Sequence, residues 1–176
     1  MKPSFEIAAT GQLVAVRLHG ICTREFSPFF MEAAGALVAQ ADNRQLMVDV
    51  TECRYMDSTF LGCLLALYRR ADTAMWIRAD DAGRQLFASA RIDQVISVRD
   101  ELSPIGSHQW TVIVATDEPD AARLVRQVAD AHRQLADMEG PHAEVCRTIA
   151  EQLEQEITDA EATTDNLDTV RRGDGD

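Results

Sequence analysis

Residues 46–70 read LMVDVTECRYMDSTFLGCLLALYRR, and this stretch decides the fold. Its opening residues, 46–50, form a short apolar run that is typical of a buried strand. An Asp-Ser-Thr sequence at 57–59 then precedes an apolar segment of helix length at 60–68, which two arginines follow. Short polar side chains favour the start of a helix, and cations favour its C-terminal end. The stretch therefore predicts a strand, a loop and a buried helix.

Further strands and helices alternate on both sides of this stretch. The turn residues Thr10-Gly11-Gln12 separate two β-forming runs, and Ser27-Pro28 is typical of a helix start. Parallel strands need helical crossovers of the length seen here, so we expect an α/β domain with a partly parallel, mixed sheet and helices packed against it. The predicted elements are a hairpin with strands at 5–8 and 13–18, a helix at about 28–41, a strand at 75–77, a helix at 82–90 and a strand at 95–98.

The pattern changes beyond residue 102. A loop at 103–107 leads to one more strand at 110–115, whose place in the sheet the sequence leaves open. Apolar residues at helical spacing then predict a helical hairpin over 117–158, turning at Gly140-Pro141. Residues 159–176 carry almost no large apolar side chains, so we expect a disordered acidic tail there. The domain proper is expected to span residues 1–116.

The charge of the chain is uneven. The 176 residues carry 29 acidic and 17 basic side chains, a formal net charge of −12. The first 116 residues hold 13 acidic and 11 basic side chains, whereas the remaining 60 hold 16 acidic and 6 basic. A phosphate-binding surface needs clustered Lys and Arg, so nucleic acid is excluded as a partner. The acidic third is expected to be a solvated helix face and tail, with an acidic docking surface as the alternative.

Other patterns exclude several classes of protein. No run approaches the roughly 18 apolar residues of a membrane helix, and no secretory signal precedes the domain, so a cytoplasmic protein without membrane contact is expected. The sequence lacks the hydrolase elbow, the phosphate-binding loop, the dinucleotide fingerprint and the zinc-protease motif, so we expect no catalysis and no cofactor. Neither metal binding nor disulfides are expected from cysteines at 22, 53, 63 and 146 or histidines at 19, 108, 132 and 142.

The central stretch resembles a known family. The sequence Met-Asp-Ser-Thr-Phe-Leu-Gly at 56–62, closed by Tyr68 and Arg69, is similar to the central motif of the STAS domain family. That family includes bacterial anti-sigma factor antagonists and the cytoplasmic domains of sulfate transporters. The resemblance covers roughly residues 4–102, and the order of elements predicted from the residues agrees with the ββαβαβα order of the family.

The resemblance implies a protein without catalysis of its own that acts by partner switching. Such an antagonist binds an anti-sigma factor, itself a serine kinase, and so frees a sigma factor. The kinase phosphorylates the serine that follows the motif aspartate, which releases the antagonist, and a PP2C-type phosphatase reverses the modification. The corresponding acceptor here is Ser58, with Thr59 as a weaker candidate.

The residues around Ser58 leave several roles open. Asp57, Ser58 and Thr59 are also ordinary helix-capping residues, and Asp57 either orients the Ser58 hydroxyl or caps the helix. Phe60 replaces the usual glycine of the motif, and its ring is either buried or part of a hydrophobic partner surface. Thr23 stands where antagonists often carry an aspartate at the partner-facing end of the sheet. All five residues are candidates for partner binding.

A second class of function stays open beside the switch. Under that hypothesis the chain is a non-switching scaffold or a ligand-sensing STAS module that assembles through its C-terminal helices. Ser58 then only caps the helix that follows it. The helical hairpin itself packs on the domain, on its own two helices, or against a second copy or a regulatory partner. Replacing Ser58 by Asp discriminates the two classes, because only the switch requires Ser58 for release of a partner.

Overall fold

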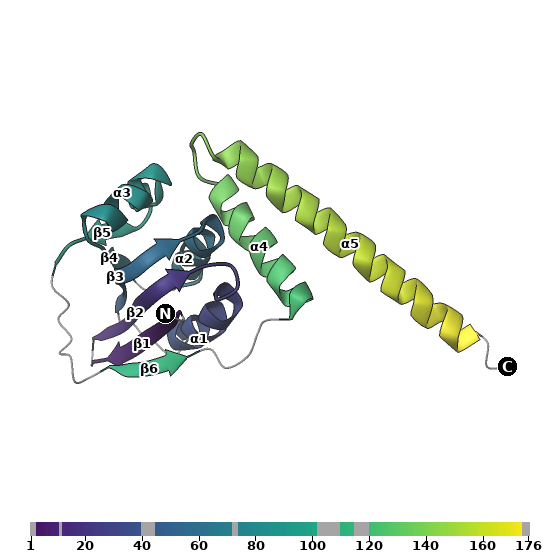
Figure 1. The fold of residues 1–176 in the computed structure, drawn as a ribbon, viewed down its shortest axis with the longest axis horizontal. Coiled ribbons are helices and arrows are strands. Elements are labelled where there is room, and N and C mark those ends of the chain that lie inside the picture. Colours follow the sequence, from purple (N-terminus) through teal and green to yellow (C-terminus); the bar gives the residue numbers. More distant parts are fainter. Residues whose placement is uncertain are drawn as a thin grey trace.

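Six strands form one mixed sheet in the order β5-β4-β3-β2-β1-β6 (Figure 1). The structure is a computed structural model, and it describes residues 3–10, 12–39, 45–71, 74–101, 110–114 and 120–173, the last ten of these as backbone only. Strand β1 pairs antiparallel with β2 and β6, whereas β2, β3, β4 and β5 pair in parallel. The strands are β1 (Ser4–Ala9), β2 (Leu13–Cys22), β3 (Gln45–Met56), β4 (Met75–Arg78), β5 (Ser97–Arg99) and β6 (Thr111–Val114).

Helices supply the crossovers that the parallel pairs require. They are α1 (Ser27–Ala39) between β2 and β3, α2 (Ser58–Arg70) between β3 and β4, and α3 (Asp81–Ser89) before β5. The predicted α/β class, the hairpin at the N-terminus and the alternation of strands and helices are therefore confirmed. The strand whose place the sequence left open is β6, which lies at the sheet edge beside β1.

Several predicted boundaries were wrong. Strand β2 runs to Cys22 rather than ending at residue 18. Strand β3 runs to Met56 rather than ending at residue 50, because its second half continues to pair with β2 through two register shifts. A 3₁₀ turn at Ile92–Gln94 occupies the chain before β5, which starts at Ser97 rather than at residue 95. The predicted loop at 103–107, Gly11 of the first turn, and the last residues of the predicted helix at 28–41 and strand at 110–115 lie outside the described residues.

Two further helices follow the sheet and form the predicted hairpin. Helix α4 (Ala121–Ala136) packs on α2, and α5 (Ala143–Gly173) packs along α4 and extends past it, away from the sheet (Figure 1). The disordered tail expected at 159–176 was wrong for residues 159–173, which are helical. The expectation considered only apolar burial, whereas these residues include good helix formers and gain local hydrogen bonds, such as the 2.8 Å bond from Gln155 to Asp159.

An aromatic cluster joins α1 and α2 to the sheet. Phe60 is fully buried, with its ring stacked on Phe26 at 6.0 Å between centroids and tilted against Phe30 at 4.8 Å. Phe5 of β1 meets Phe30 edge-on at 5.8 Å. Each buried aromatic ring removes a large apolar area from water, and the ring pairs add specific packing. The bulky residue that replaces the motif glycine is therefore part of the core.

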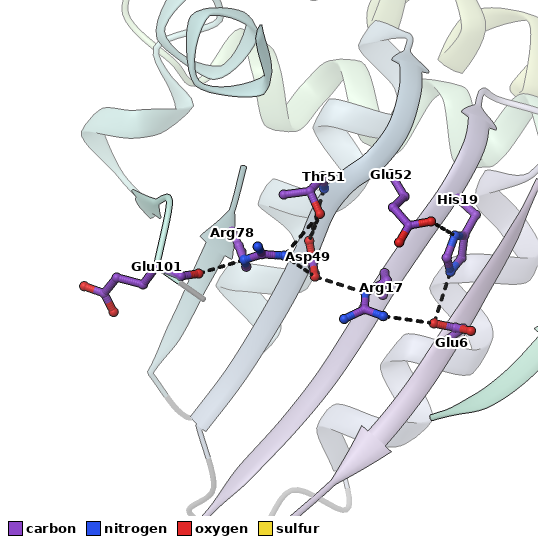
Figure 2. A network of polar contacts seen from close by, with 8 residues as sticks. All are labelled: Glu6, Arg17, His19, Asp49, Thr51, Glu52, Arg78 and Glu101. Atoms are coloured by element: carbon purple, nitrogen blue, oxygen red, sulfur yellow. Dashed lines mark hydrogen bonds and ion pairs between the residues drawn. The ribbon is translucent and has the colours of Figure 1, made fainter. Parts of the chain in front are cut away.

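The opposite face of the sheet carries a polar network around Asp49 (Figure 2). The Asp49 side chain has no exposed surface, and its carboxylate accepts from Arg17 Nε at 3.1 Å and from Arg78 Nη1 at 2.8 Å. Thr51 donates to the same carboxylate from its hydroxyl at 2.7 Å and from its backbone N–H at 3.1 Å. Arg17 also lies 3.4 Å from Glu6 and stacks under the Trp110 ring at 4.1 Å from the centroid. Strands β1 to β4 are thus tied together by charge on this face.

The network sets the ionisation of Asp49. Burial alone would raise the pKa of this carboxyl group, because the charged form loses hydration. The hydrogen bonds from Thr51, Arg17 and Arg78 outweigh that effect, so the pKa of Asp49 lies below its ordinary value. The carboxylate is therefore charged at neutral pH and balances two partly buried arginines.

We expect Asp49→Asn to lower the free energy of unfolding by about 3–5 kcal/mol, because it removes the fully buried negative charge that two partly buried arginines share. Urea unfolding followed by circular dichroism measures the change. Asp93→Asn, at an exposed carboxylate, is the matched control and should alter stability by less than about 0.5 kcal/mol. Equal stability of the two variants would contradict the role of the network.

The same carboxylate predicts a loss of stability in acid. A group whose pKa is depressed by folding stabilises the native state above the pKa of the unfolded chain, about 3.9 for Asp, and this contribution disappears as the pH falls through the lower native pKa. The difference in unfolding free energy between the wild type and Asp49→Asn should therefore shrink below about pH 5. Urea titrations at pH 7, 5, 4 and 3 test this; a difference that stays constant would refute it.

Candidate functional site

The start of α2 is fixed by Asp57. Its Oδ1 accepts a 2.9 Å hydrogen bond from the backbone N–H of Phe60, which makes Asp57 the N-cap of the helix. Its Oδ2 accepts from the backbone N–H of Arg24 at 2.9 Å, in the turn that follows β2. Of the two roles that the sequence left open, the geometry gives Asp57 the capping role. The carboxylate also ties the helix start to the end of β2.

This cap sets which side chains of the first turn face outward. Ser58 is the first residue of α2 and is exposed, whereas Thr59 is 3% exposed and Phe60 is fully buried. The sequence prediction that Thr59 and Phe60 bind a partner was therefore wrong, since both point into the core. Burial equally removes Thr59 as an accessible phosphoacceptor. Of these three residues, only Ser58 presents its side chain at the surface.

The Ser58 hydroxyl has a partner that the sequence did not indicate. It lies 3.2 Å from Nε2 of His132 on α4, and the imidazole is 5% exposed. The other ring nitrogen, Nδ1, lies 2.8 Å from the carbonyl oxygen of Val128. A carbonyl only accepts, so Nδ1 carries the proton and donates, and Nε2 of the neutral ring accepts from the Ser58 hydroxyl. Because the two residues are 74 positions apart, no local pattern could have paired them.

Thr23 lies in the turn after β2, beside the residue whose backbone binds Asp57. Its hydroxyl donates to Glu25 at 2.7 Å, and the hydrogen bonds from Thr23 and then Arg24 hold the pKa of Glu25 below its ordinary value. The structure therefore brings Thr23, Asp57 and Ser58 together at one end of the sheet. This agrees with the expected position of Thr23 at the edge that carries the motif.

Two exposed apolar side chains flank this end of the sheet. Ile21 and Tyr55 are paired neighbours on β2 and β3, and their side chains are 49% and 57% exposed. On the α3 side, a groove of about 510 Å³ runs between residues 50–56 of β3 and α3. Sequence reasoning missed both residues because it ended the two strands at residues 18 and 50. With β2 extended to Cys22 and β3 to Met56, Ile21 and Tyr55 form an exposed apolar surface near the motif. We call Ile21 and Tyr55 the apolar pair.

Two further kinds of feature are absent from the described residues. Within this part of the chain, no three His, Cys, Asp or Glu side chains come together in a way that could hold a metal ion. None of its helices combines the length and apolar character needed to cross a membrane. The features that stand out are therefore Ser58, its helix start and the apolar pair.

Two solved structures are similar to part of this chain. A crystal structure of an anti-sigma factor antagonist from Mycobacterium paratuberculosis is similar, with 20% identity and a TM-score of 0.49, over 57% of this chain and 88% of that one. The anti-sigma factor antagonist SpoIIAA in its unphosphorylated form is similar with 16% identity and a TM-score of 0.46, over 56% of this chain and 89% of that one. No curated protein sequence matches the chain.

The sequence comparison identifies the family directly. Residues 5–100 match the family described as "Mlab, STAS domain". This match spans more than half of the 176 residues and includes every strand from β1 to β5 together with the capped start of α2. The chain belongs to the STAS domain family.

Proposed function

We propose that the protein is an anti-sigma factor antagonist that acts by partner switching. In its unphosphorylated form it binds an anti-sigma factor serine kinase in the cytoplasm, and phosphorylation of Ser58 releases it. A PP2C-type phosphatase restores the binding form. The observation that carries the proposal is that Ser58, the motif serine, is exposed at the first position of a capped helix while its neighbours Thr59 and Phe60 are buried.

The position of Ser58 suits a reversible phosphate. Backbone N–H groups and the positive end of the helix dipole favour an anion at the start of α2. The Asp57 cap uses the N–H of Phe60, so the first turn is held whether or not Ser58 is modified. Phosphorylation adds about −1.5 to −2 charges. The domain therefore stays folded, and the change acts on the partner contact through repulsion and desolvation.

The apolar pair is the docking surface for the anti-sigma factor in this proposal. Ile21 and Tyr55 lie at the same end of the sheet as Ser58, where Cys22 of β2 is hydrogen-bonded to the N–H of Asp57. Partly exposed aromatic residues are frequent anchors of protein interfaces, and polar residues around them form a rim. Thr23 and Glu52 supply such a rim here. A phosphate beside this surface would place charge at its edge.

One observation favours the alternative of a scaffold that assembles through its C-terminal helices. A groove of about 530 Å³ lies between α4 and α5, and its lining includes Ala122, Val125 and Ile157. A second copy of the chain could bury this groove, which would give a homodimer. The switch and the scaffold differ in whether a negative charge introduced at position 58 changes what the chain binds.

Ser58→Asp should weaken capture of the partner by about tenfold or more while the domain remains folded, because it fixes a charge at the docking edge. The full chain carrying Ser or Asp at 58 is used to isolate binding proteins from native cells, and mass spectrometry identifies them. The expected partner of the Ser58 form is an ATPase of the histidine-kinase-like class. Phosphopeptide mapping of the endogenous protein should also find phosphate on Ser58.

Ser97→Asp is the matched control, since it adds the same charge at an exposed serine on the edge strand β5. It should bind as the wild type does. If Ser58→Asp captured the ATPase as well as the wild type, the switch would be abandoned. Recovery of only the chain itself from every form would favour the scaffold.

Tyr55→Ala should reduce affinity for the same ATPase by about tenfold or more with little change in stability, because an exposed aromatic anchor is lost. Val112→Ala removes apolar area from a side chain that is likewise 57% exposed, on the far edge strand β6. Isothermal calorimetry compares the two variants with the wild type. Equal affinity of Tyr55→Ala and Val112→Ala would place the docking surface elsewhere.

A further inference from the structure

We propose that the α4–α5 hairpin is an internal cover of the phosphorylation site. In the described arrangement α4 packs on α2 and makes a hydrogen bond with the Ser58 hydroxyl. Helix α4 must therefore move away from α2 before a kinase can phosphorylate Ser58. The inference rests on the proposed function, in which Ser58 is the acceptor. It assigns a role to the part of the chain that lies outside residues 5–100, the region that matches the family.

The first support is the direction of the Ser58 hydroxyl. Although the residue is exposed, its hydroxyl donates to Nε2 of His132, and the Val128 carbonyl fixes the tautomer that makes this nitrogen an acceptor. A kinase needs the same proton to pass to its own catalytic base while the oxygen attacks the γ-phosphate of ATP. Both events require the hydroxyl to turn away from α4. In this arrangement Ser58 therefore lies at the surface, but its hydroxyl is not available to accept a phosphate.

The second support is the close contact one helical turn after Ser58. Gly62 lies on the same side of α2 as Ser58, because residues four apart share a helix face. A Cβ atom at this position would lie 2.2 Å from the carbonyl oxygen of Ala131, which is backbone and cannot turn aside. Helix α4 thus rests directly on the backbone of α2, and glycine is the residue that permits it. Such an approach marks a specific contact rather than a loose association of two surfaces.

The remaining contacts of α4 with α2 are of two kinds. Helix α4 packs buried apolar side chains, such as Leu135, into the core cluster that contains α2, and its polar contacts are partly exposed. Gln127 donates to the Cys63 sulfur at 3.2 Å, and Arg69 pairs with Asp137 at 3.0 Å. Exposed ion pairs of this kind contribute little to stability. A hollow of about 120 Å³, lined in part by Ser58 and Leu61, remains between the hairpin turn and the end of α3. The cover is therefore well defined in position, and its displacement would expose apolar side chains such as Leu135.

The apolar pair lies outside the cover. Ile21 and Tyr55 stay about half exposed while α4 is in place, so a partner can dock on them before Ser58 becomes available. This gives an order of events in which docking comes first, α4 moves, and phosphate transfer follows. The cover would then limit phosphorylation to a kinase that has bound.

The test uses Gly62→Ala in the full chain, because the added methyl group collides with Ala131 and should push α4 off α2. Gly35→Ala is the matched control: it is the same change in a helix, at a position with no atom within 4 Å of the added Cβ. Hydrogen exchange measured by mass spectrometry should show faster exchange of residues 121–136 in Gly62→Ala, by about tenfold or more, and no change in Gly35→Ala. This readout needs no kinase.

The second readout is the initial rate of Ser58 phosphorylation by the histidine-kinase-like ATPase captured by the unmodified chain, with Mg²⁺ and ATP. We expect the rate to rise by about fivefold or more in Gly62→Ala and in His132→Ala, which removes the buried imidazole and with it the hydrogen bond to Ser58. Gly35→Ala should match the wild type. His132→Ala carries the test if Gly62→Ala fails to fold.

The outcomes separate the two proposals. If Ser58 of the wild type is phosphorylated and neither variant accelerates it, the cover is refuted and the proposed function stands. Unchanged exchange of α4 in a folded Gly62→Ala variant also refutes the cover. If α4 is released and Ser58 is phosphorylated in no form of the chain, the proposed function itself fails. Faster phosphorylation only in Gly62→Ala and His132→Ala supports both.

Discussion

The arrangement of the site depends on one carboxylate. Asp57 accepts backbone hydrogen bonds from Phe60 and from Arg24, and so fixes both the first turn of α2 and its position against the end of β2. With the helix starting at this residue, the Phe60 side chain enters the aromatic cluster and the Ser58 side chain faces outward. A helix start shifted by one residue would rotate the side chains by about 100° and exchange these roles. The accessibility of Ser58 is thus a consequence of capping geometry.

The sequence predicts the elements well because their signals are local. Apolar runs, turn residues and helix spacing indicate most strands and helices, and the motif at 56–62 indicates the family. The motif could not show which way each of its side chains points, so Thr59 and Phe60 were wrongly assigned to a partner surface. The direction of each side chain depends on which residue caps the helix, and Asp57, Ser58 and Thr59 can all act as N-caps. Only the observed hydrogen bonds decide among them.

Features that depend on contacts distant in sequence could not be predicted at all. His132 reaches Ser58, and Ala131 meets Gly62, only because the hairpin folds back onto α2. The apolar stripe of α4 was visible in the sequence, but a stripe does not name the surface that it covers. Similarly, Asp49 lies within the predicted strand at 46–50, and the sequence gives no sign that Arg17 and Arg78 converge on it.

Closure of α4 over Ser58 and phosphorylation of Ser58 disfavour each other for a physical reason. The hydroxyl of Ser58 meets His132 next to the buried side chains of Leu61, Leu135 and Met138, where a doubly charged group would lose much of its hydration. The hairpin and tail region also carries 16 of the 29 acidic residues, so added negative charge is repelled on average. Linkage then requires reciprocity: if closure of α4 disfavours phosphorylated Ser58, phosphorylation disfavours closure by the same factor. A phosphate on Ser58 would therefore act on two surfaces at once: the docking surface at the apolar pair, and the contact between α4 and α2.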